Sequence, residues 1–402
     1  MTDFWLEIST LDYVLMGALF LVFVAQVYFY ARYIDAPERK LRKDRKTPIS
    51  NIQSPKEAPG VSVILSAHNE GYNLSQYLPL LLSQDYPTYE VIVVNDGSED
   101  DTQTVVDAYA AHDPRLHSTF VPRGARVRST KKLALTLAAK SAQYDYLLLT
   151  DADCVPESNH WISEMMKGFE PSAVSNQPLA IVLGFGAYFE EQGAINRMTR
   201  YDTLFNGLHY LGAALCGHPY MGVGRNLAYR KSLFFESGGF SHLMDNRAGD
   251  DDLFVNHVAT RENTAVVLSR DSFTWSLTKK NLRDWWLQKR RHLSVSPSYR
   301  KETKWRLAME PMTRGLFYAL VLAIVVCQLM NISQLSTLNL PLIVAIGLFA
   351  ARWIIQTAII NTSAFRMGLG RFSMFSILWY DIVLPLISLY MLVVPQRKNN
   401  KW

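Results

Sequence analysis

Two aspartates one residue apart, Asp151 and Asp153, directly follow an apolar run in the stretch YDYLLLTDADCVP (144–156). Burying two like charges this close together is costly unless a positive group lies between them. Both carboxylates could bind one divalent cation, or one could bind the cation while the other contacts a sugar. Mg²⁺ and Mn²⁺ favour oxygen ligands, and Mg²⁺ often keeps substrate phosphates among them. The pair therefore predicts a metal that carries a nucleotide diphosphate, although a bare D-x-D also occurs in solvated turns.

Acidic and polar residues also end two other predicted strands. GVSVILSA (60–67) and YEVIVVNDGS (89–98) have the pattern of buried strands, and a helical pattern follows each of them. With YDYLLLT as the third strand, this alternation predicts an α/β domain with a parallel sheet and right-handed crossovers. Ligands bind beyond the carboxyl ends of such strands. His68-Asn69-Glu70, Asp96 and the Asp151–Asp153 pair would therefore converge on one crevice.

The bulk composition limits the classes of protein. The 402 residues are 49% hydrophobic and 19% charged, which is enough for one large domain or two ordinary ones. The net charge of +5 comes largely from residues 32–46, so we expect no nucleic-acid partner. Cys154, Cys216 and Cys327 lack metal-ligand spacing and imply no disulfide framework, which agrees with a reducing cytoplasm.

Four apolar runs are long enough to enter a bilayer: 13–31, 314–332, 340–360 and 373–395. The acidic N-terminus and the missing cleavage site argue against a signal peptide. Because residues 32–46 are strongly basic, the positive-inside tendency puts that side in the cytoplasm. The uncharged loop NISQLSTLN (331–339) is then expected on the outer side.

The fourth run, 373–395, conflicts with the positive-inside tendency. A full crossing would leave QRKNNK outside, and the run contains Asp381 and Pro385, a costly pair for a simple span. A full crossing and a re-entrant segment with a cytoplasmic tail both remain open.

These observations predict four regions. They are a transmembrane anchor (1–34), a basic juxtamembrane linker (35–58), a cytoplasmic α/β domain (59–310) with an amphipathic interfacial helix near 281–295, and a C-terminal membrane region (311–402) with two to three segments. We expect a multi-pass protein of the bacterial inner membrane.

Seven motifs follow one another between residues 60 and 292: SVILSAHNE, VIVVNDGSEDDT, KKLALTLAA, LLLTDADCVP, GVGRNLAYRK, GDDDLF and QKRRH. In their order and content the chain resembles membrane-bound family 2 glycosyltransferases, in particular the group of poly-N-acetylglucosamine and glucosylceramide synthases. The resemblance implies the GT-A fold, a Rossmann-like α/β domain that binds a nucleotide sugar, with flanking transmembrane helices. It does not specify the sugar.

The resemblance also implies roles for individual residues. Asp153 would bind the metal, Mg²⁺ or Mn²⁺, under the diphosphate. The residues implied at the nucleotide sugar are Ala67, His68, Glu70, Asp96, Lys132, Asp151, Gln288 and Arg291. Lys132 has a second interpretation as a solvated lysine at a helix start.

A carboxylate in RAGDDDLFVNH (247–257) is expected to take a proton from the acceptor hydroxyl. The family pattern Glu-Asp-x-Asp-Leu, aligned without a gap, puts this base at Asp250 and puts Gly249 where the family has Glu. This departure leaves Asp250 and Asp251 both open, with Asp250 favoured. One of these acids could instead cap the helix that starts near Leu253.

Two motifs border the expected acceptor. QKRRH (288–292) resembles Gln-x-x-Arg-Trp, with Gln288 and Arg291 matching and His292 replacing the Trp that helps to form the acceptor pocket. In GHPYMGVGRNLAYRK (217–231), Gly224, Arg225 and Asn226 would lie close to the chemistry.

The sequence thus predicts an inverting, metal-dependent hexosyl- or N-acetylhexosaminyltransferase that uses a UDP-sugar and a lipid or lipid-linked acceptor. The alternatives are a processive polysaccharide synthase and a non-catalytic, nucleotide-sensing membrane scaffold. GDDDL beside D-x-D also suggests a template-directed polymerase, but the chain lacks the extended basic groove that nucleic acid requires.

Overall fold

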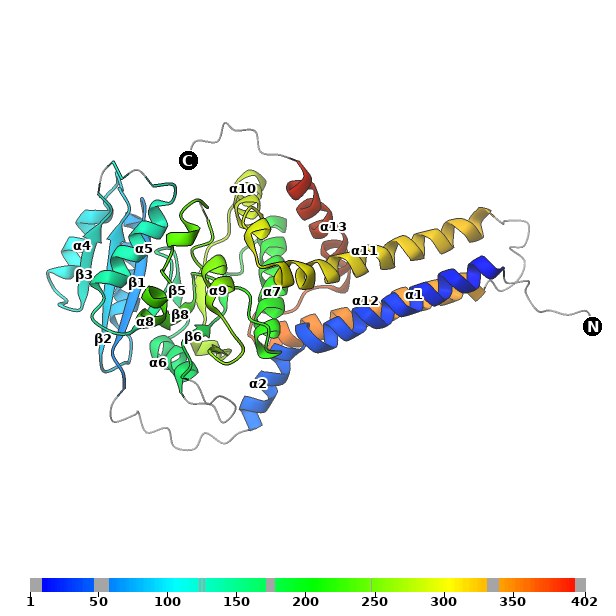
Figure 1. Ribbon diagram of the computed structural model, residues 1–402, viewed down its shortest axis with the longest axis horizontal. Coiled ribbons are helices and arrows are strands. Elements are labelled where there is room, and N and C mark those ends of the chain that lie inside the picture. The colour runs from blue at the N-terminus through cyan, green and yellow to red at the C-terminus, as the bar shows by residue number, and fades with distance from the viewer. Residues whose placement is uncertain are drawn as a thin grey trace, which may run out of the picture.

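The computed structural model describes residues 9–46, 58–122, 124–125, 127–170, 178–246, 248–330 and 340–394. An α/β domain lies at one end, and three long helices run away from it (Figure 1). The predicted outer loop, 331–339, and the QRKNNK tail lie outside the described residues.

The central sheet has the strand order β3-β2-β1-β4-β8-β6-β9. Its strands are β1 (Val61–Ala67), β2 (Tyr89–Asn95), β3 (Leu116–Phe120), β4 (Tyr146–Leu149), β6 (Ile181–Leu183), β8 (Leu227–Arg230) and β9 (Thr264–Val266). β3, β2, β1 and β4 are parallel, as predicted. The prediction of a wholly parallel sheet is wrong at β8, which is antiparallel to β4 and β6. The reason is that the segment before β8 stays at the carboxyl edge of β4, so β8 enters the sheet there and runs back.

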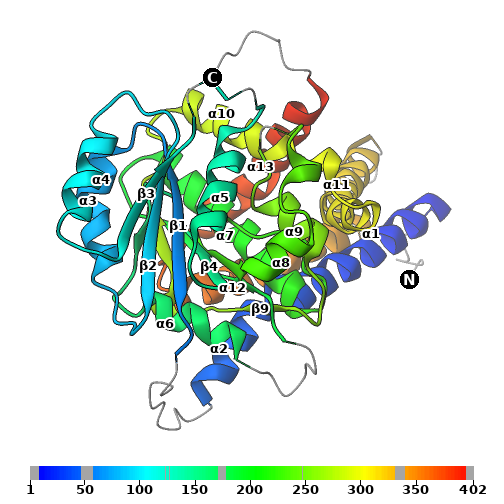
Figure 2. The ribbon, with the colours of Figure 1, turned by 60° about the vertical axis from the view of Figure 1, so that its left-hand side comes forward.

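Helices cover both faces of this sheet (Figure 2). One core contains the side chains of α3 (Gly71–Leu82), α4 (Thr102–Ala110) and α6 (Trp161–Met166). The opposite core contains those of α5 (Thr130–Ser141), α7 (Ala194–Leu215), α8 (Lys231–Glu236) and α9 (Asp252–Val258). Val63 and Leu65 of β1 face the first core and Ile64 faces the second, which explains why apolar residues do not simply alternate with polar ones in this strand.

A second, smaller sheet has the order β5-β10-β7 and consists of β5 (Val155–Pro156), β10 (Thr274–Ser276) and β7 (Gly186–Tyr188). Val155 pairs with Trp275, so the chain enters this sheet immediately after the aspartate pair. The aspartates are thereby held between two sheets.

Within the described residues, four helices are long and apolar enough to cross a membrane. Three of them, α1 (Thr10–Phe29), α11 (Lys301–Met330) and α12 (Leu340–Arg366), form one bundle around Leu19, Phe317, Ile324 and Ala345 (Figure 1). α1 continues through a π-helical turn (Tyr30–Ile34) into α2 (Ala36–Lys46), where Glu38 forms ion pairs with Arg42 and with Arg366 at the end of α12. The C-terminal ends of α1 and α12 therefore both lie at the domain.

The fourth apolar helix, α13 (Met374–Val393), does not continue the bundle but lies beside the domain (Figure 1). Its first turn lies at α12, where Trp353 donates a hydrogen bond to the carbonyl of Met374 (2.9 Å). Just after its last turn, the carbonyl of Val394 accepts a hydrogen bond from Arg290 (2.7 Å). α13 thus begins beside the middle of α12 and ends beside α10 (Leu282–Leu293) of the domain.

Asp381 of α13, whose charge would be unfavourable in a simple membrane span, is fully buried, and nearby cations balance its charge. Its carboxylate forms ion pairs with Arg314 of α11 and Arg352 of α12, both at 2.9 Å. Gln356 and Tyr318 donate further hydrogen bonds to it. Asp381 thus joins α13 to two helices of the bundle.

The expected amphipathic helix is α10 (Leu282–Leu293). Trp285 of this helix is buried in the main core, so the expectation of an interfacial helix does not hold for this side chain. Trp286 packs against Tyr390 of α13, and Lys289 pairs with Asp202 of α7 (2.6 Å). The helix is therefore held between α7 and α13.

Candidate active site

A crevice of about 610 Å³ opens beyond the carboxyl ends of β1 and β2. His68 and Asp96 line it, as predicted, together with the loop Gly97–Glu99 and Thr130. His68 Nδ1 lies 2.6 Å from the Asp96 carbonyl, and Thr130 donates a hydrogen bond to the Asp96 carboxylate (2.7 Å). Hydrogen bonds therefore join the carboxyl end of β1 to that of β2, and the carboxyl end of β2 to the start of α5.

Asn69 shapes this crevice through its backbone. It has a φ of 57°, a left-handed conformation that asparagine tolerates better than most residues. In this conformation its backbone N–H donates a hydrogen bond to the Ser98 hydroxyl (3.0 Å), and its side-chain oxygen accepts one from the Glu99 N–H (2.8 Å). Ala67, by contrast, is buried and contributes only its carbonyl, which accepts from the Asp96 N–H.

Glu70 lies beside the aspartate pair. Burial raises the pKa of its carboxyl, and the negative charges of Asp153 and Asp151 add to the effect. Asn73 donates a hydrogen bond to this carboxylate (2.6 Å). Glu70 therefore borders the aspartate pair.

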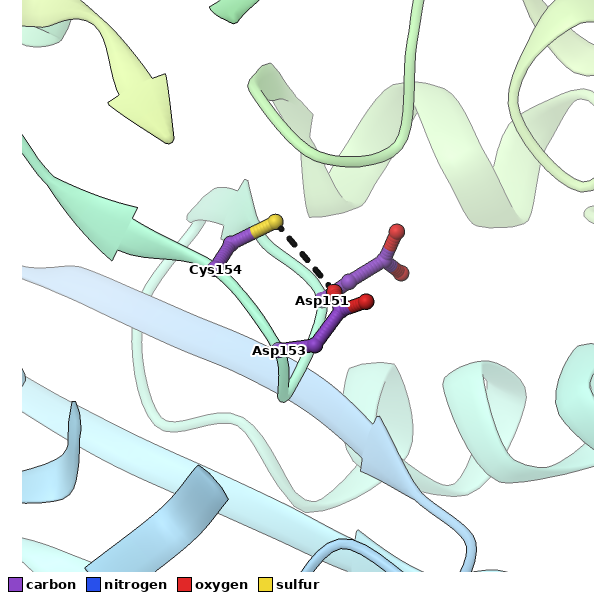
Figure 3. A group of neighbouring side chains, drawn as sticks. All are labelled: Asp151, Asp153 and Cys154. Atoms are coloured by element: carbon purple, nitrogen blue, oxygen red, sulfur yellow. Dashed lines mark hydrogen bonds between the residues drawn. The ribbon is translucent and has the colours of Figure 1, made fainter. Parts of the chain in front are cut away.

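Asp151, Asp153 and Cys154 offer three ligand atoms that all lie within 4.8 Å of one another (Figure 3). Burial raises the pKa of Asp153, and the adjacent Asp151 carboxylate raises it further. The Cys154 thiol donates a weak hydrogen bond to Asp153 (3.5 Å), and burial raises the thiol pKa well above its usual range. Among the described residues, no cationic side chain lies at hydrogen-bond distance from Asp153, and a bound divalent cation would supply the missing positive charge.

The positive group beside Asp151 is Lys131, the first lysine of the KK pair. Its ammonium lies 2.9 Å from Asp151 and 3.3 Å from Asp250, so it joins the ends of two distant segments. Desolvation alone would lower the pKa of Lys131, but the carboxylates of Asp151 and Asp250 outweigh it and raise the pKa well above its usual range. The pKa of Asp151 is lowered because Lys131, and then Arg225 and Arg291, outweigh the effect of burial.

The prediction that Lys132 contacts the nucleotide is contradicted by its position. Lys132 is fully buried, and its ammonium donates hydrogen bonds to the carbonyls of Leu243, Asn246 and Ala248 at 2.7–2.8 Å. With its three donors taken, this side chain fixes the loop that leads to Asp250. Lys131, and not the predicted Lys132, is therefore the lysine of the KK pair that lies at the site.

The GDDD segment separates the roles of its acids. Asp251 caps α9, and its two oxygens accept hydrogen bonds from the N–H groups of Gly224 and Asp252, both at 2.7 Å. Asp250 instead forms an ion pair with Lys131 (3.3 Å). Of the two candidates for the base, the geometry therefore leaves Asp250 with the freer carboxylate.

Gly249 explains the departure from the family pattern. Its φ is +89°, and a Cβ at this position would lie 2.5 Å from Leu253 Cδ1. A glutamate therefore has no room here, and the tight turn requires glycine.

The three residues predicted on the acceptor side take different positions. Asn226 is fully buried and supports the fold, because it bonds Trp161 and the carbonyls of Phe185 and Ser272. Arg225 stacks on Tyr188 (4.3 Å) and donates to the carbonyls of Gly186 and Ala187. Gly224 contacts Asp251 through its N–H, as described above. These contacts contradict a direct role for Asn226 and make Arg225 a buried positive charge next to the aspartate pair.

α10 brings the last predicted residues to the site. Gln288 donates a hydrogen bond to Tyr188 (3.2 Å), the same ring that supports Arg225. Arg291 is exposed, and its charge helps to lower the pKa of Asp151. His292 follows it and is also exposed to solvent.

Comparison with known proteins gives one family-model match: Glycosyl transferase family 2, over residues 62–238. A poly-beta-1,6-N-acetyl-D-glucosamine synthase of Staphylococcus epidermidis is 32% identical over 126 residues, and one of Staphylococcus aureus is 27% identical over 137. These alignments cover 30% and 34% of this chain, but only 29% and 30% of the relatives' own lengths.

The fold also resembles a mannosyltransferase of Pyrobaculum calidifontis, solved in complex with GDP-Man and Mn²⁺. The TM-score is 0.53 at 18% identity, with 88% of this chain and 99% of the other covered. At this identity the likeness concerns the fold.

Proposed function

Since residues 62–238 form a family 2 glycosyltransferase domain with the GT-A fold, we propose that the protein transfers a sugar from a nucleotide sugar to an acceptor at the membrane surface. The observation that carries this proposal is the convergence of Asp151, Asp153 and Asp250 around Lys131. A binding scaffold would not require a third carboxylate on Lys131, opposite the aspartate pair.

Asp153 would hold a divalent cation, with Asp151 beside it. The carboxylate oxygens suit Mg²⁺ or Mn²⁺, and the raised pKa of Asp153 indicates a site that lacks positive charge. The bound cation would neutralise charge on the diphosphate. The Mn²⁺ complex of the structural neighbour supports a divalent ion of this kind.

The crevice lined by His68 and Asp96 would hold the nucleoside. The hydroxyl of Thr130 and the side chain of Asp96 offer polar groups to a base or ribose. We propose UDP as the nucleotide, by resemblance to the family. Because the structural neighbour was solved with GDP-Man, GDP is the alternative nucleotide that the assay must test.

Asp250 would act as the base. A single carboxylate that removes the proton from the acceptor hydroxyl, as the hydroxyl attacks from the face opposite the diphosphate, gives inversion at the anomeric carbon. Lys131 and Arg291 would meet the negative charge that develops on the departing diphosphate, because both already lie close enough to lower the pKa of Asp151.

The acceptor is proposed to be a lipid or lipid-linked molecule. In the described residues α1, α11 and α12 pack directly on one another around Leu19 and Phe317, which favours a single transfer over threading of a polymer between them. The likeness to poly-N-acetylglucosamine synthases favours the processive alternative, so the product must be measured.

We also propose the membrane arrangement. The regions would be those expected from the sequence: 1–34, 35–58, 59–310 and 311–402. α1, α11 and α12 would cross the inner membrane with the domain on the cytoplasmic side. α13 would not cross the membrane fully, because it begins beside Trp353 in the middle of α12 and ends beside Arg290 of the domain helix α10.

The test is a transfer assay on membranes that contain the protein, with labelled UDP- and GDP-sugars and either Mg²⁺ or Mn²⁺. Metal-dependent label in organic-soluble material supports the proposal, and label in large polymer identifies the processive alternative. If no donor is used with any metal although the protein binds UDP, the scaffold interpretation replaces the enzyme.

A further inference from the structure

The N-terminal turn of α9, which carries the proposed base just before it, is bonded to the segment that leads into α11. Tyr299 donates a hydrogen bond to Asp252 Oδ2 (2.9 Å), and the other Asp252 oxygen accepts from the Leu253 N–H (2.7 Å). Both side chains are 8% exposed. Water therefore has little access to replace this contact.

A second contact lies one turn further along α9. Asn256, also buried, accepts a hydrogen bond from the Arg300 N–H (3.0 Å) and donates to Thr303 (3.2 Å). The same amide group donates to the carbonyl of Tyr220 (2.9 Å). Two successive turns of α9 thus hold residues 299–303.

The segment held in this way connects two functional elements. It follows α10, which carries Gln288 and Arg291, and it runs into α11, the first membrane helix after the domain. Asp250 lies two residues before Asp252, separated from it only by the capping residue Asp251. A shift of the first turn of α9 would therefore move Asp250 relative to Lys131 and the aspartate pair.

We propose that Asp252 and Tyr299 act as positioning residues that fix the proposed base, Asp250, relative to α10 and the membrane helices. This proposal rests on the proposed function, because the role of Asp250 as the base is part of that function. Neither side chain contacts the aspartate pair, so each acts through the first turn of α9. A rate loss is expected when the hydroxyl is removed, because displacements of about 1 Å cost roughly 100-fold in rate.

The charge state of Asp252 agrees with this role. Burial raises its pKa to about 8, and the adjacent Asp251 carboxylate raises it further. Near neutral pH the carboxyl is mostly protonated, so it holds Tyr299 without adding a third negative charge beside Asp250 and Asp251.

The test compares Tyr299→Phe with Tyr229→Phe in the full-length protein. Tyr229 is a matched control: it is fully buried and packs on Phe254 of the same helix (4.9 Å), but its hydroxyl has no hydrogen-bond partner. We expect Tyr299→Phe to lower kcat roughly 10- to 100-fold with the donor KM and nucleotide affinity unchanged within about twofold. Tyr229→Phe should keep kcat within about twofold.

Asp252→Asn and Asp252→Ala complete the set. Asn retains an acceptor for the Leu253 N–H and a partner for Tyr299, so it should keep most of the turnover, whereas Ala should resemble Tyr299→Phe. An unchanged kcat in Tyr299→Phe overturns the proposal. So does a kcat that falls only in parallel with nucleotide affinity and melting temperature, because that pattern indicates a general loss of folding.

A second readout does not depend on turnover. Hydrogen–deuterium exchange of residues 250–258 should speed up in Tyr299→Phe and not in Tyr229→Phe. Equal exchange in both variants overturns the positioning role. If the wild-type protein turns over no nucleotide sugar, the proposed function is wrong. The exchange result would still show whether the Tyr299–Asp252 hydrogen bond holds α9 in place.

Discussion

The adjacent lysines Lys131 and Lys132 give the sharpest test of the site, because their side chains have opposite surroundings. We consider Lys131→Met and Lys132→Met, which remove the ammonium and keep much of the aliphatic volume. Lys131 joins two carboxylates in the crevice, whereas Lys132 is buried beneath the loop before Asp250.

The expected stability loss follows from the contacts of Lys132. Its three hydrogen bonds from a charged donor contribute about 1.5 kcal/mol each at the lower end of the usual range. Relief of the desolvated ammonium offsets part of this, which leaves a loss of about 3 kcal/mol. For a domain of this size that corresponds to a fall in melting temperature of roughly 6–12 °C.

Lys131→Met should behave differently. Its ammonium is 41% exposed, so its removal should change the melting temperature less than the removal of Lys132 does. Turnover should fall about 10²–10³-fold, because the charge facing the diphosphate is lost.

The assay pairs thermal unfolding in detergent with transfer of the identified donor sugar, at one protein concentration for both variants. The reasoning is refuted if Lys132→Met keeps the wild-type melting temperature while losing turnover and Lys131→Met remains active. That result would support the original prediction that Lys132 contacts the nucleotide.

Three further predictions concern stability. Gly249→Ala should lower the melting temperature and abolish transfer, because the left-handed backbone costs about 1–3 kcal/mol and the Cβ meets Leu253; wild-type behaviour in both would contradict this. Asp252, with its pKa raised to about 8, binds a proton in the folded state that the unfolded chain releases near pH 4, so its stabilising contribution falls as pH rises to about 8. In thermal scans, the melting temperature of Asp252→Asn should therefore rise relative to that of wild type between pH 5 and about pH 8. A difference in melting temperature that stays constant over this range would exclude the raised pKa of Asp252. Asp381→Asn should cost about 3–5 kcal/mol by leaving Arg314 and Arg352 poorly compensated, and an unchanged melting temperature would argue against the buried network.

Much of the domain could be predicted because its signals are local. Val61–Ala67 and Tyr89–Asn95 are predominantly apolar runs followed by polar residues, and such runs specify buried parallel strands. The positions of His68, Asp96 and Asp151 followed from the strand ends alone. The antiparallel β8 could not be predicted this way, because its direction depends on where the preceding loop lies in space.

The two lysines show where local patterns fail. Both precede the buried residues Ala134, Leu135 and Ala138 at helical spacing, so periodicity does not decide which one is buried. The choice depends on the carbonyls of Leu243, Asn246 and Ala248, which lie more than a hundred residues away. For the same reason the capping role of Asp251 needed the N–H of Gly224, a contact that the GDDD motif does not contain.

The central claim is that Asp250 is the base of a glycosyl transfer. The most direct measurement is the single-turnover rate of sugar transfer by wild type, Asp250→Asn and Asp251→Asn, with nucleotide affinity measured in parallel. The account predicts that Asp250→Asn loses about 10²–10⁴-fold in rate while it still binds the nucleotide. Asp251→Asn should lose mainly stability, about 1 kcal/mol from the weakened helix cap. Transfer by Asp250→Asn at the wild-type rate would contradict the account.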